Sequence, residues 1–187
     1  MLTRWLFAAG IVLLIGMGAW LGLPEAKKSM MDDGKALAFS LPDLEGKMQG
    51  LPQGEVVVLN FWATWCPPCR KEMPSMSALY RKYAEKGLKV VAVSVDRDAG
   101  DLAAFVREYD LPFTVLHDAD SSVSHDYSVY RYPETFLIDR QGYVRYHLVG
   151  AVEWMSDSII KGIEGLLNEP VQRSGVQHDG ANSPASH

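Results

Sequence analysis

The chain has 187 residues, only two cysteines and a formal net charge of −5 at pH 7. This length suits a single domain with a sizeable buried core. The acidic balance, without any basic block, argues against a nucleic-acid-binding protein. Two cysteines cannot form the disulfide framework of a small secreted protein, whereas a C-x-x-C pair near alternating strands and helices favours redox chemistry.

The N-terminal region contains an uncharged apolar segment at residues 5–23, preceded by Arg4. Its length approaches the ~20 apolar residues that cross a bilayer. Trp5 and Trp20 lie near its ends, where interfacial aromatic residues are expected. We therefore expect residues 1–23 to form a single-pass transmembrane anchor in the inner membrane, with the following domain on the periplasmic side. A cleaved signal peptide is the alternative, because small residues precede position 20.

The rest of the chain divides into a linker, a domain and a tail. Residues 24–36 are polar and are predicted to form a tether, followed by a folded domain at residues 37–168. Residues 169–187 lack hydrophobic periodicity and are predicted to be disordered. At the start of the domain, two short apolar segments flank a turn near Gly46, which predicts a β-hairpin.

The two cysteines lie where a predicted strand meets a predicted helix. Residues 56–62 are β-branched and aromatic, which is typical of a buried strand. Apolar residues then recur at spacings of three and four, which predicts an amphipathic helix over residues 67–85. Cys66 is therefore expected at the helix N-cap, with Pro67 at the first helical position, where its missing N–H has no energetic cost. Gly87 is expected to end the helix.

The remaining elements alternate between strands and helices. Further strands are predicted at residues 88–95, 113–116, 133–139 and 143–149, and further helices at 101–109, 121–129 and 153–167. The strand at 88–95 is continuously apolar, which suits the centre of a sheet covered on both faces. The last helix is expected to turn Met155, Ile159 and Ile163 inward. This order predicts an α/β fold with a mixed central sheet flanked by helices.

A helix N-terminus gives the cysteine pair a chemical role. Its unpaired N–H groups and partial positive charge stabilise a thiolate, so Cys66 should ionise more easily than a free cysteine. Cys69 is close enough to attack a mixed disulfide formed at Cys66. Pro67 and Pro68 supply no N–H, so we expect moderate thiolate stabilisation and a reducing or intermediate redox couple.

The sequence of residues 61–74, FWATWCPPCRKEMP, resembles that of the membrane-anchored thioredoxin-like oxidoreductases of the TlpA/ResA type. The likeness extends over about residues 37–167. It implies a thioredoxin-like fold with an N-terminal β-hairpin and an inserted helix. It also implies a reductase of disulfides in exported proteins, such as apocytochrome c or the copper-site cysteines of oxidase subunits, with a membrane thiol reductase as electron donor.

The same resemblance assigns roles to further residues. An X–Pro bond is trans by default, but the resemblance implies a cis Tyr132–Pro133 bond facing Cys66, where an extended substrate can pair. It implies that Glu72 lies near the dithiol, where this carboxylate could help to deprotonate Cys69. Thioredoxins carry a buried aspartate where this chain has Asn60. Trp65 is expected to cap the dithiol and to contact a partner protein.

Two other classes of function remain open. A thiol peroxidase of the peroxiredoxin type would place threonine three residues before its reactive cysteine, but Ala63 occupies that position and Thr64 follows it. A copper- or zinc-binding module would need further ligands, and the five histidines form no paired spacing with the cysteines. No Gly-x-Gly-x-x-Gly fingerprint follows a strand, so no dinucleotide cofactor is expected.

Overall fold

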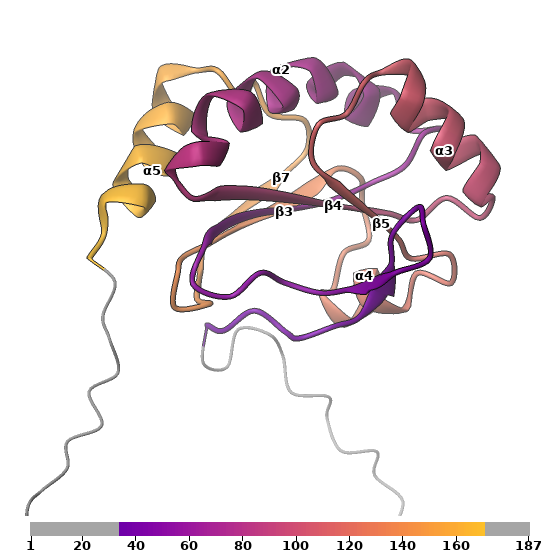
Figure 1. Ribbon diagram of the computed structural model, residues 1–187, viewed down its shortest axis with the longest axis horizontal. Coiled ribbons are helices and arrows are strands. Elements are labelled where there is room, and N and C mark those ends of the chain that lie inside the picture. Colours follow the sequence, from indigo (N-terminus) through magenta and orange to yellow (C-terminus); the bar gives the residue numbers. More distant parts are fainter. Residues whose placement is uncertain (1–33, 171–187) are drawn as a thin grey trace, which may run out of the picture. The chain divides into compact units, whose positions relative to one another are not determined.

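The computed structural model describes residues 34–170, which are coloured in Figure 1. The predicted anchor at 1–23, most of the tether and the tail from residue 171 lie outside the described residues. Within residues 34–170, no helix is both long and apolar enough to cross a bilayer.

The described elements follow the predicted order. They are β1 (Leu41–Pro42), β2 (Met48–Gln49), β3 (Val56–Trp62), α2 (Pro67–Tyr83), the 3-10 turn Ala84–Lys86, β4 (Leu88–Ser94), α3 (Ala99–Glu108), β5 (Thr114–His117), α4 (Ser122–Asp126), β6 (Glu134–Ile138), β7 (Val144–Val149) and α5 (Asp157–Asn168). Strands β1 and β2 form the predicted antiparallel hairpin. The thioredoxin-like α/β fold is thereby confirmed, with a mixed sheet and an N-terminal hairpin.

The main sheet has the strand order β5-β4-β3-β6-β7. Strand β3 is parallel to β4 and antiparallel to β6. The strand predicted at 88–95 is β4, an interior strand paired with β3 and β5, as its apolar sequence predicts. Strand β3 lies in the middle of the sheet, because β6 pairs with its other edge. Helices α2, α3 and α5 cover one face of the sheet, and α4 and the hairpin lie on the other (Figure 1). All seven residues of β3 are buried, as a strand covered on both faces requires.

Helix α2 is held to the sheet by the apolar face that the sequence predicts. Met73, Met76 and Leu79 are fully buried in the main hydrophobic core. Burial of such side chains contributes about 1.5–3 kcal/mol each. Gly87 adopts a φ of 94° at the end of the following 3-10 turn, a conformation that favours glycine. This packing fixes the N-terminal end of α2 directly above the end of β3.

An aromatic cluster fills the opposite face of the sheet. Tyr127 packs between Phe61 and Phe136, with ring centroids 5.2 and 5.4 Å away. Its hydroxyl donates a 2.6 Å hydrogen bond to the carbonyl of Leu37, and burial raises the pKa of Tyr127. Lys35, in the predicted tether, forms an isolated antiparallel β-bridge with Tyr143. These contacts secure the first described residues to the far side of the sheet.

The final helix starts later than its apolar spacing suggests. Helix α5 begins at Asp157, with Ser156 in an extended conformation as its N-cap. Met155, expected to face inward, precedes the helix and is 39% exposed, whereas Trp154 is fully buried. The prediction for Met155 was therefore wrong, because a turn at residues 153–156 places the neighbouring indole in the core.

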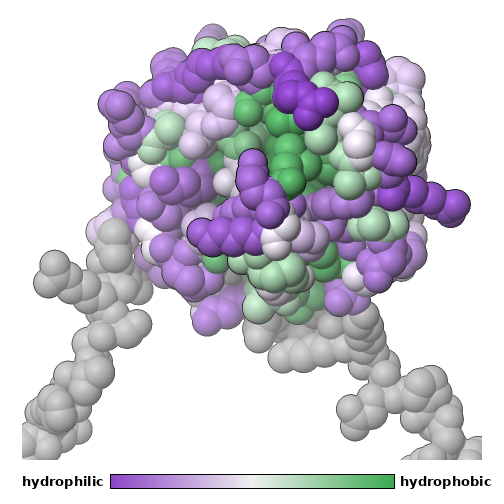
Figure 2. All heavy atoms as spheres, turned by 45° about the vertical axis from the view of Figure 1, so that its right-hand side comes forward, coloured by the Kyte–Doolittle hydropathy of each residue, from purple (hydrophilic) through white to green (hydrophobic). Residues whose placement is uncertain are grey.

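On the face seen in Figure 2, hydrophilic side chains predominate, and apolar residues gather mainly in a central hollow and in a smaller group below it. Scattered apolar residues on a protein surface are ordinary. A functional site must therefore be located from specific side chains and clefts rather than from surface hydropathy.

Candidate active site

The cysteine pair occupies the start of α2, as the sequence predicts. Cys66 is the N-cap residue, in an extended conformation with φ −93° and ψ 107°. Its sulfur accepts a 3.3 Å hydrogen bond from the backbone N–H of Cys69, and its carbonyl accepts one from Arg70 at 3.1 Å. Prolines fill the first two helical positions. The capping group of this helix is thus the redox sulfur itself.

Cys66 and Cys69 form a disulfide, with their Cα atoms 5.3 Å apart. The side chains differ in accessibility: Cys66 is 4% exposed and Cys69 is 0% exposed. A thiol from another molecule can therefore contact the pair only at Cys66 in this conformation.

The loop before β6 lies against Cys66. The Tyr132–Pro133 peptide bond is cis, as the family resemblance implies. The carbonyl oxygen of Tyr132 lies 3.6 Å from the Cys66 sulfur. Trp65 is 64% exposed, and its ring meets that of Tyr132 edge to face, with centroids 6.0 Å apart. The structure therefore brings Trp65, Cys66, Tyr132 and Pro133 together, although they come from two distant parts of the chain.

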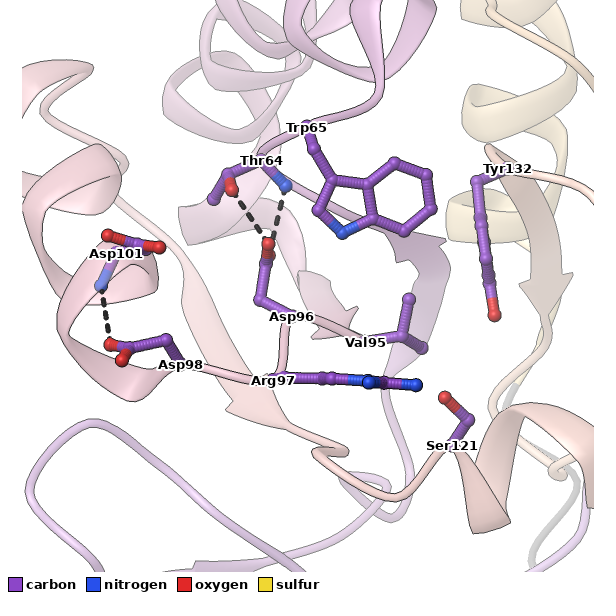
Figure 3. Close-up of a pocket in the computed structure, with 9 residues that line it drawn as sticks. All are labelled: Thr64, Trp65, Val95, Asp96, Arg97, Asp98, Asp101, Ser121 and Tyr132. Atoms are coloured by element: carbon purple, nitrogen blue, oxygen red, sulfur yellow. Dashed lines mark hydrogen bonds between the residues drawn. The ribbon is translucent and has the colours of Figure 1, made fainter.

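A cleft of about 500 Å³ opens beside these residues. Its lining, drawn in Figure 3, consists of Thr64, Trp65, Val95, Asp96, Arg97, Asp98, Asp101, Ser121 and Tyr132. The rings of Trp65 and Tyr132 form one wall, and the Arg97 side chain extends along the floor towards Ser121 (Figure 3). The redox sulfur thus lies next to a cleft with an aromatic wall and a charged floor.

Asp96 fixes the loop that carries Trp65 and Cys66. Its carboxylate accepts hydrogen bonds from the backbone N–H of Thr64 at 2.9 Å and from the Thr64 hydroxyl at 2.7 Å (Figure 3). The Ser94 hydroxyl donates to the same carboxylate at 2.6 Å. Arg70 adds a 3.3 Å hydrogen bond to the Thr64 carbonyl. The sequence reasoning missed Asp96, although an aspartate just after an apolar strand was a signal that it could have used.

Glu72 lies in the buried layer between α2 and the sheet and is 2% exposed. It accepts hydrogen bonds from Asn60 Nδ2 at 3.0 Å and from the Val152 backbone N–H at 2.9 Å. Burial raises the pKa of Glu72 to about 7, although both donors act in the opposite direction. The indole N–H of Trp154 also lowers the pKa of Glu72, although it forms no hydrogen bond with the carboxylate in this structure. Glu72 can therefore exchange a proton near neutral pH.

Comparison with known proteins identifies the family. Residues 33–147 match the AhpC/TSA family. A thiol-disulfide oxidoreductase ResA of Bacillus cereus is 40% identical over 154 residues, covering 79% of this chain and 89% of the relative. The chain belongs to the AhpC/TSA family, among its ResA-like members. The thioredoxin-like protein YneN of Bacillus subtilis (strain 168) is 39% identical over 160 residues, covering 81% and 93% of the two chains.

Solved structures of ResA-like oxidoreductases and their neighbours share this fold. A thiol:disulfide interchange protein of the DsbE type from Chlorobium tepidum superposes with a TM-score of 0.67 at 38% identity, over 71% of this chain and 95% of the other. A thioredoxin of Neisseria meningitidis gives a TM-score of 0.64 at 35% identity, over 72% and 91%. Family membership and the Cys66–Cys69 pair make this protein a thiol-disulfide oxidoreductase.

The structure also bears on the residues by which the peroxidase and metal-binding alternatives were judged. Ala63, at the position of the peroxiredoxin threonine, is fully buried, and the Thr64 hydroxyl is bonded to Asp96. The relatives compared above are named for thiol–disulfide exchange or as thioredoxins. Residues 34–170 contain no group of three or more histidine, cysteine, aspartate or glutamate side chains arranged to hold a metal.

Proposed function

We propose that this oxidoreductase reduces disulfides in exported proteins, with Cys66 as nucleophile and Cys69 as resolving thiol. The observation that carries this assignment is the contrast between Cys66, which keeps 4% of its surface exposed next to the cleft, and Cys69, which is completely buried. The Cys66 thiolate attacks a substrate disulfide, forms a mixed disulfide and releases one substrate thiolate. Cys69 then attacks Cys66 and releases the second substrate thiolate. Two electrons pass to the substrate, and the Cys66–Cys69 disulfide forms.

The helix start supports a reducing direction. Within the described residues, the Cys66 sulfur accepts one backbone hydrogen bond, from Cys69. Neither Pro67 nor Pro68 has an N–H to add a second or a third. Strongly oxidising dithiols have an unusually stable reduced form, so a site with few donors favours the disulfide and donates electrons more readily.

Glu72 is proposed to accept the proton of the Cys69 thiol. The two residues are three positions apart on α2, which places them on one face of the helix, and both are buried. A general base works best when its pKa lies near the working pH. The pKa of about 7 for Glu72 meets that condition. Asn60 cannot take this role, because an amide does not accept a proton at neutral pH.

Trp65, Tyr132 and Pro133 are proposed to hold the substrate against Cys66. An extended segment can pair with the backbone next to the cis-proline, while the exposed Trp65 ring supplies apolar contact. The resemblance to the TlpA/ResA type suggests apocytochrome c as a substrate, since its Cys-x-x-Cys-His segment must be reduced before haem attachment. We further propose that residues 1–23 anchor the protein in the inner membrane and that a membrane thiol reductase restores the dithiol.

Trapping in cells tests the proposal. Cys69→Ser should accumulate mixed disulfides with exported proteins, because the resolving thiol is absent, whereas the matched Cys66→Ser variant should accumulate none. Diagonal electrophoresis and mass spectrometry identify the trapped partners. A redox titration of the purified protein checks the direction of electron flow. A midpoint near the oxidising end, about −120 mV, would contradict the assignment as a reductase.

A further inference from the structure

A small pocket lies beside Glu72, apart from the cleft beside Trp65. A pocket of about 220 Å³ is lined by Lys71, Glu72, Ala151, Val152 and Glu153. None of these residues lines the cleft beside Trp65. Glu72 as a residue is only 2% exposed, and it borders this pocket but not the cleft beside Trp65.

The wall of this pocket is tied to α2 at two points. The backbone N–H of Val152 donates to Glu72 Oε2 at 2.9 Å, and the backbone N–H of Trp154 donates to Ser75 Oγ at 3.4 Å. Ser75 Oγ in turn donates to the Glu72 carbonyl at 2.9 Å. These hydrogen bonds therefore hold the loop at residues 151–154 against α2 at Glu72 and Ser75.

The residues around Glu72 favour a water molecule, rather than a charged side chain, as its proton-exchange partner. Lys71 and Glu153 are exposed on the solvent side of the pocket, and Asn60 and Thr135 on the sheet side do not titrate. Asn60 Oδ1 is buried without a hydrogen-bond partner among the described residues, a situation that water normally relieves. The pocket greatly exceeds the ~15 Å³ needed for one water molecule.

We propose that this pocket is the proton exit of the active site, used while a substrate protein covers the cleft beside Trp65. The inference rests on the proposed function. The Cys69 thiol gives its proton to the Glu72 carboxylate, and Glu72 passes it to water in the pocket. The Cys69 thiolate attacks the Cys66 sulfur of the mixed disulfide, and the substrate leaves as a thiolate that takes a proton from solvent after it dissociates. A docked protein excludes water from the cleft, so a separate exit keeps this step from stalling.

Chemical rescue tests the proton exit. In the full-length protein, Glu72→Ala removes the base and leaves space for a small carboxylate. With a protein disulfide as substrate, so that the cleft beside Trp65 is covered, we expect resolution of the mixed disulfide to slow about 100-fold, within the usual range for loss of a general base. Formate that enters through the pocket should then raise the rate of resolution in Glu72→Ala at least tenfold. Adding Ala151→Trp should abolish this rescue, whereas Ala78→Trp, an exposed alanine on the outer face of α2, should leave it intact.

The outcomes separate the two proposals. Formate rescue that is equal in the Ala151→Trp and Ala78→Trp backgrounds would overturn the proton exit alone. Unslowed resolution in Glu72→Ala would overturn both the proton exit and the proposed role of Glu72 as base. Failure to form any mixed disulfide would instead contradict the proposed function. A second measurement keeps Glu72 in place: infrared spectroscopy should show slower deuterium exchange of its carboxyl group in Ala151→Trp than in Ala78→Trp. Equal exchange rates would also overturn the proton exit.

Discussion

Asn60 on β3 donates a 3.0 Å hydrogen bond to Glu72 on α2, within the buried layer between the sheet and the helix. The same amide nitrogen donates to the Thr135 hydroxyl at 2.8 Å, because Asn60 and Thr135 are paired in register across β3 and β6. The bond links the central strand to the helix that carries the cysteines. It also holds an ionisable carboxyl group in a place where ionisation is costly.

The cost of ionising Glu72 should appear as a pH dependence of stability. Its pKa is raised from 4.5 to about 7, so the folded state loses stability as the pH rises through that interval. At about 1.4 kcal/mol per pH unit, the loss amounts to about 3 kcal/mol. In Glu72→Gln this loss should be absent. Urea unfolding of the oxidised protein at pH 5 and pH 8 measures the difference, and parallel pH profiles for the two proteins would contradict it.

A second carboxylate beside Glu72 should destabilise the fold. Asn60→Asp places two acids within hydrogen-bond distance, and only one can ionise cheaply. We expect a loss of about 3 kcal/mol in the free energy of unfolding at pH 8 and a smaller loss at pH 5. Adding Glu72→Gln should recover most of the pH-dependent part in a double-mutant cycle. If the two substitutions are additive at both pH values, the residues are not coupled as the hydrogen bond indicates.

Trp65 should matter for protein substrates and not for folding. Its ring is 64% exposed, so Trp65→Ala should change the free energy of unfolding by less than about 0.5 kcal/mol. We expect kcat/KM for a protein disulfide to fall about tenfold, equivalent to about 1.4 kcal/mol of binding. Tyr130→Ala, at another aromatic ring with 76% exposure, is the matched control. An equal loss in both variants would indicate a general surface effect.

Asp118 should be essential for the short helix before the cis-proline. It is fully buried, and its carboxylate accepts hydrogen bonds from the N–H groups of Val123 at 3.2 Å and Ser124 at 2.9 Å. Asp118→Ala leaves both donors buried and unpaired, which should cost about 2–4 kcal/mol in unfolding free energy. The exposed neighbour Asp120 accepts from one backbone N–H, and Asp120→Ala should cost less than about 1 kcal/mol. Thermal or urea unfolding of the two variants provides the comparison.

Short-range sequence patterns predicted most of the fold. The β-branched run of β3, the apolar spacing of α2 and the cysteine at the N-cap are each written in consecutive residues. Burial and capping depend on such short-range patterns, so their positions followed from the sequence. Periodicity was less reliable at Met155, because a short turn, which has no hydrophobic period, placed Trp154 in the core instead.

The sequence by itself determined that a dithiol would lie at the start of a helix, after a buried strand of an α/β domain. Only the tertiary structure decided what surrounds it: Asp96 holding Thr64, the Tyr132 carbonyl against Cys66, and Val152 binding Glu72. These partners are 32, 66 and 80 residues apart. Contacts over such separations depend on strand order and on the path of the connecting loops, which short-range patterns do not encode.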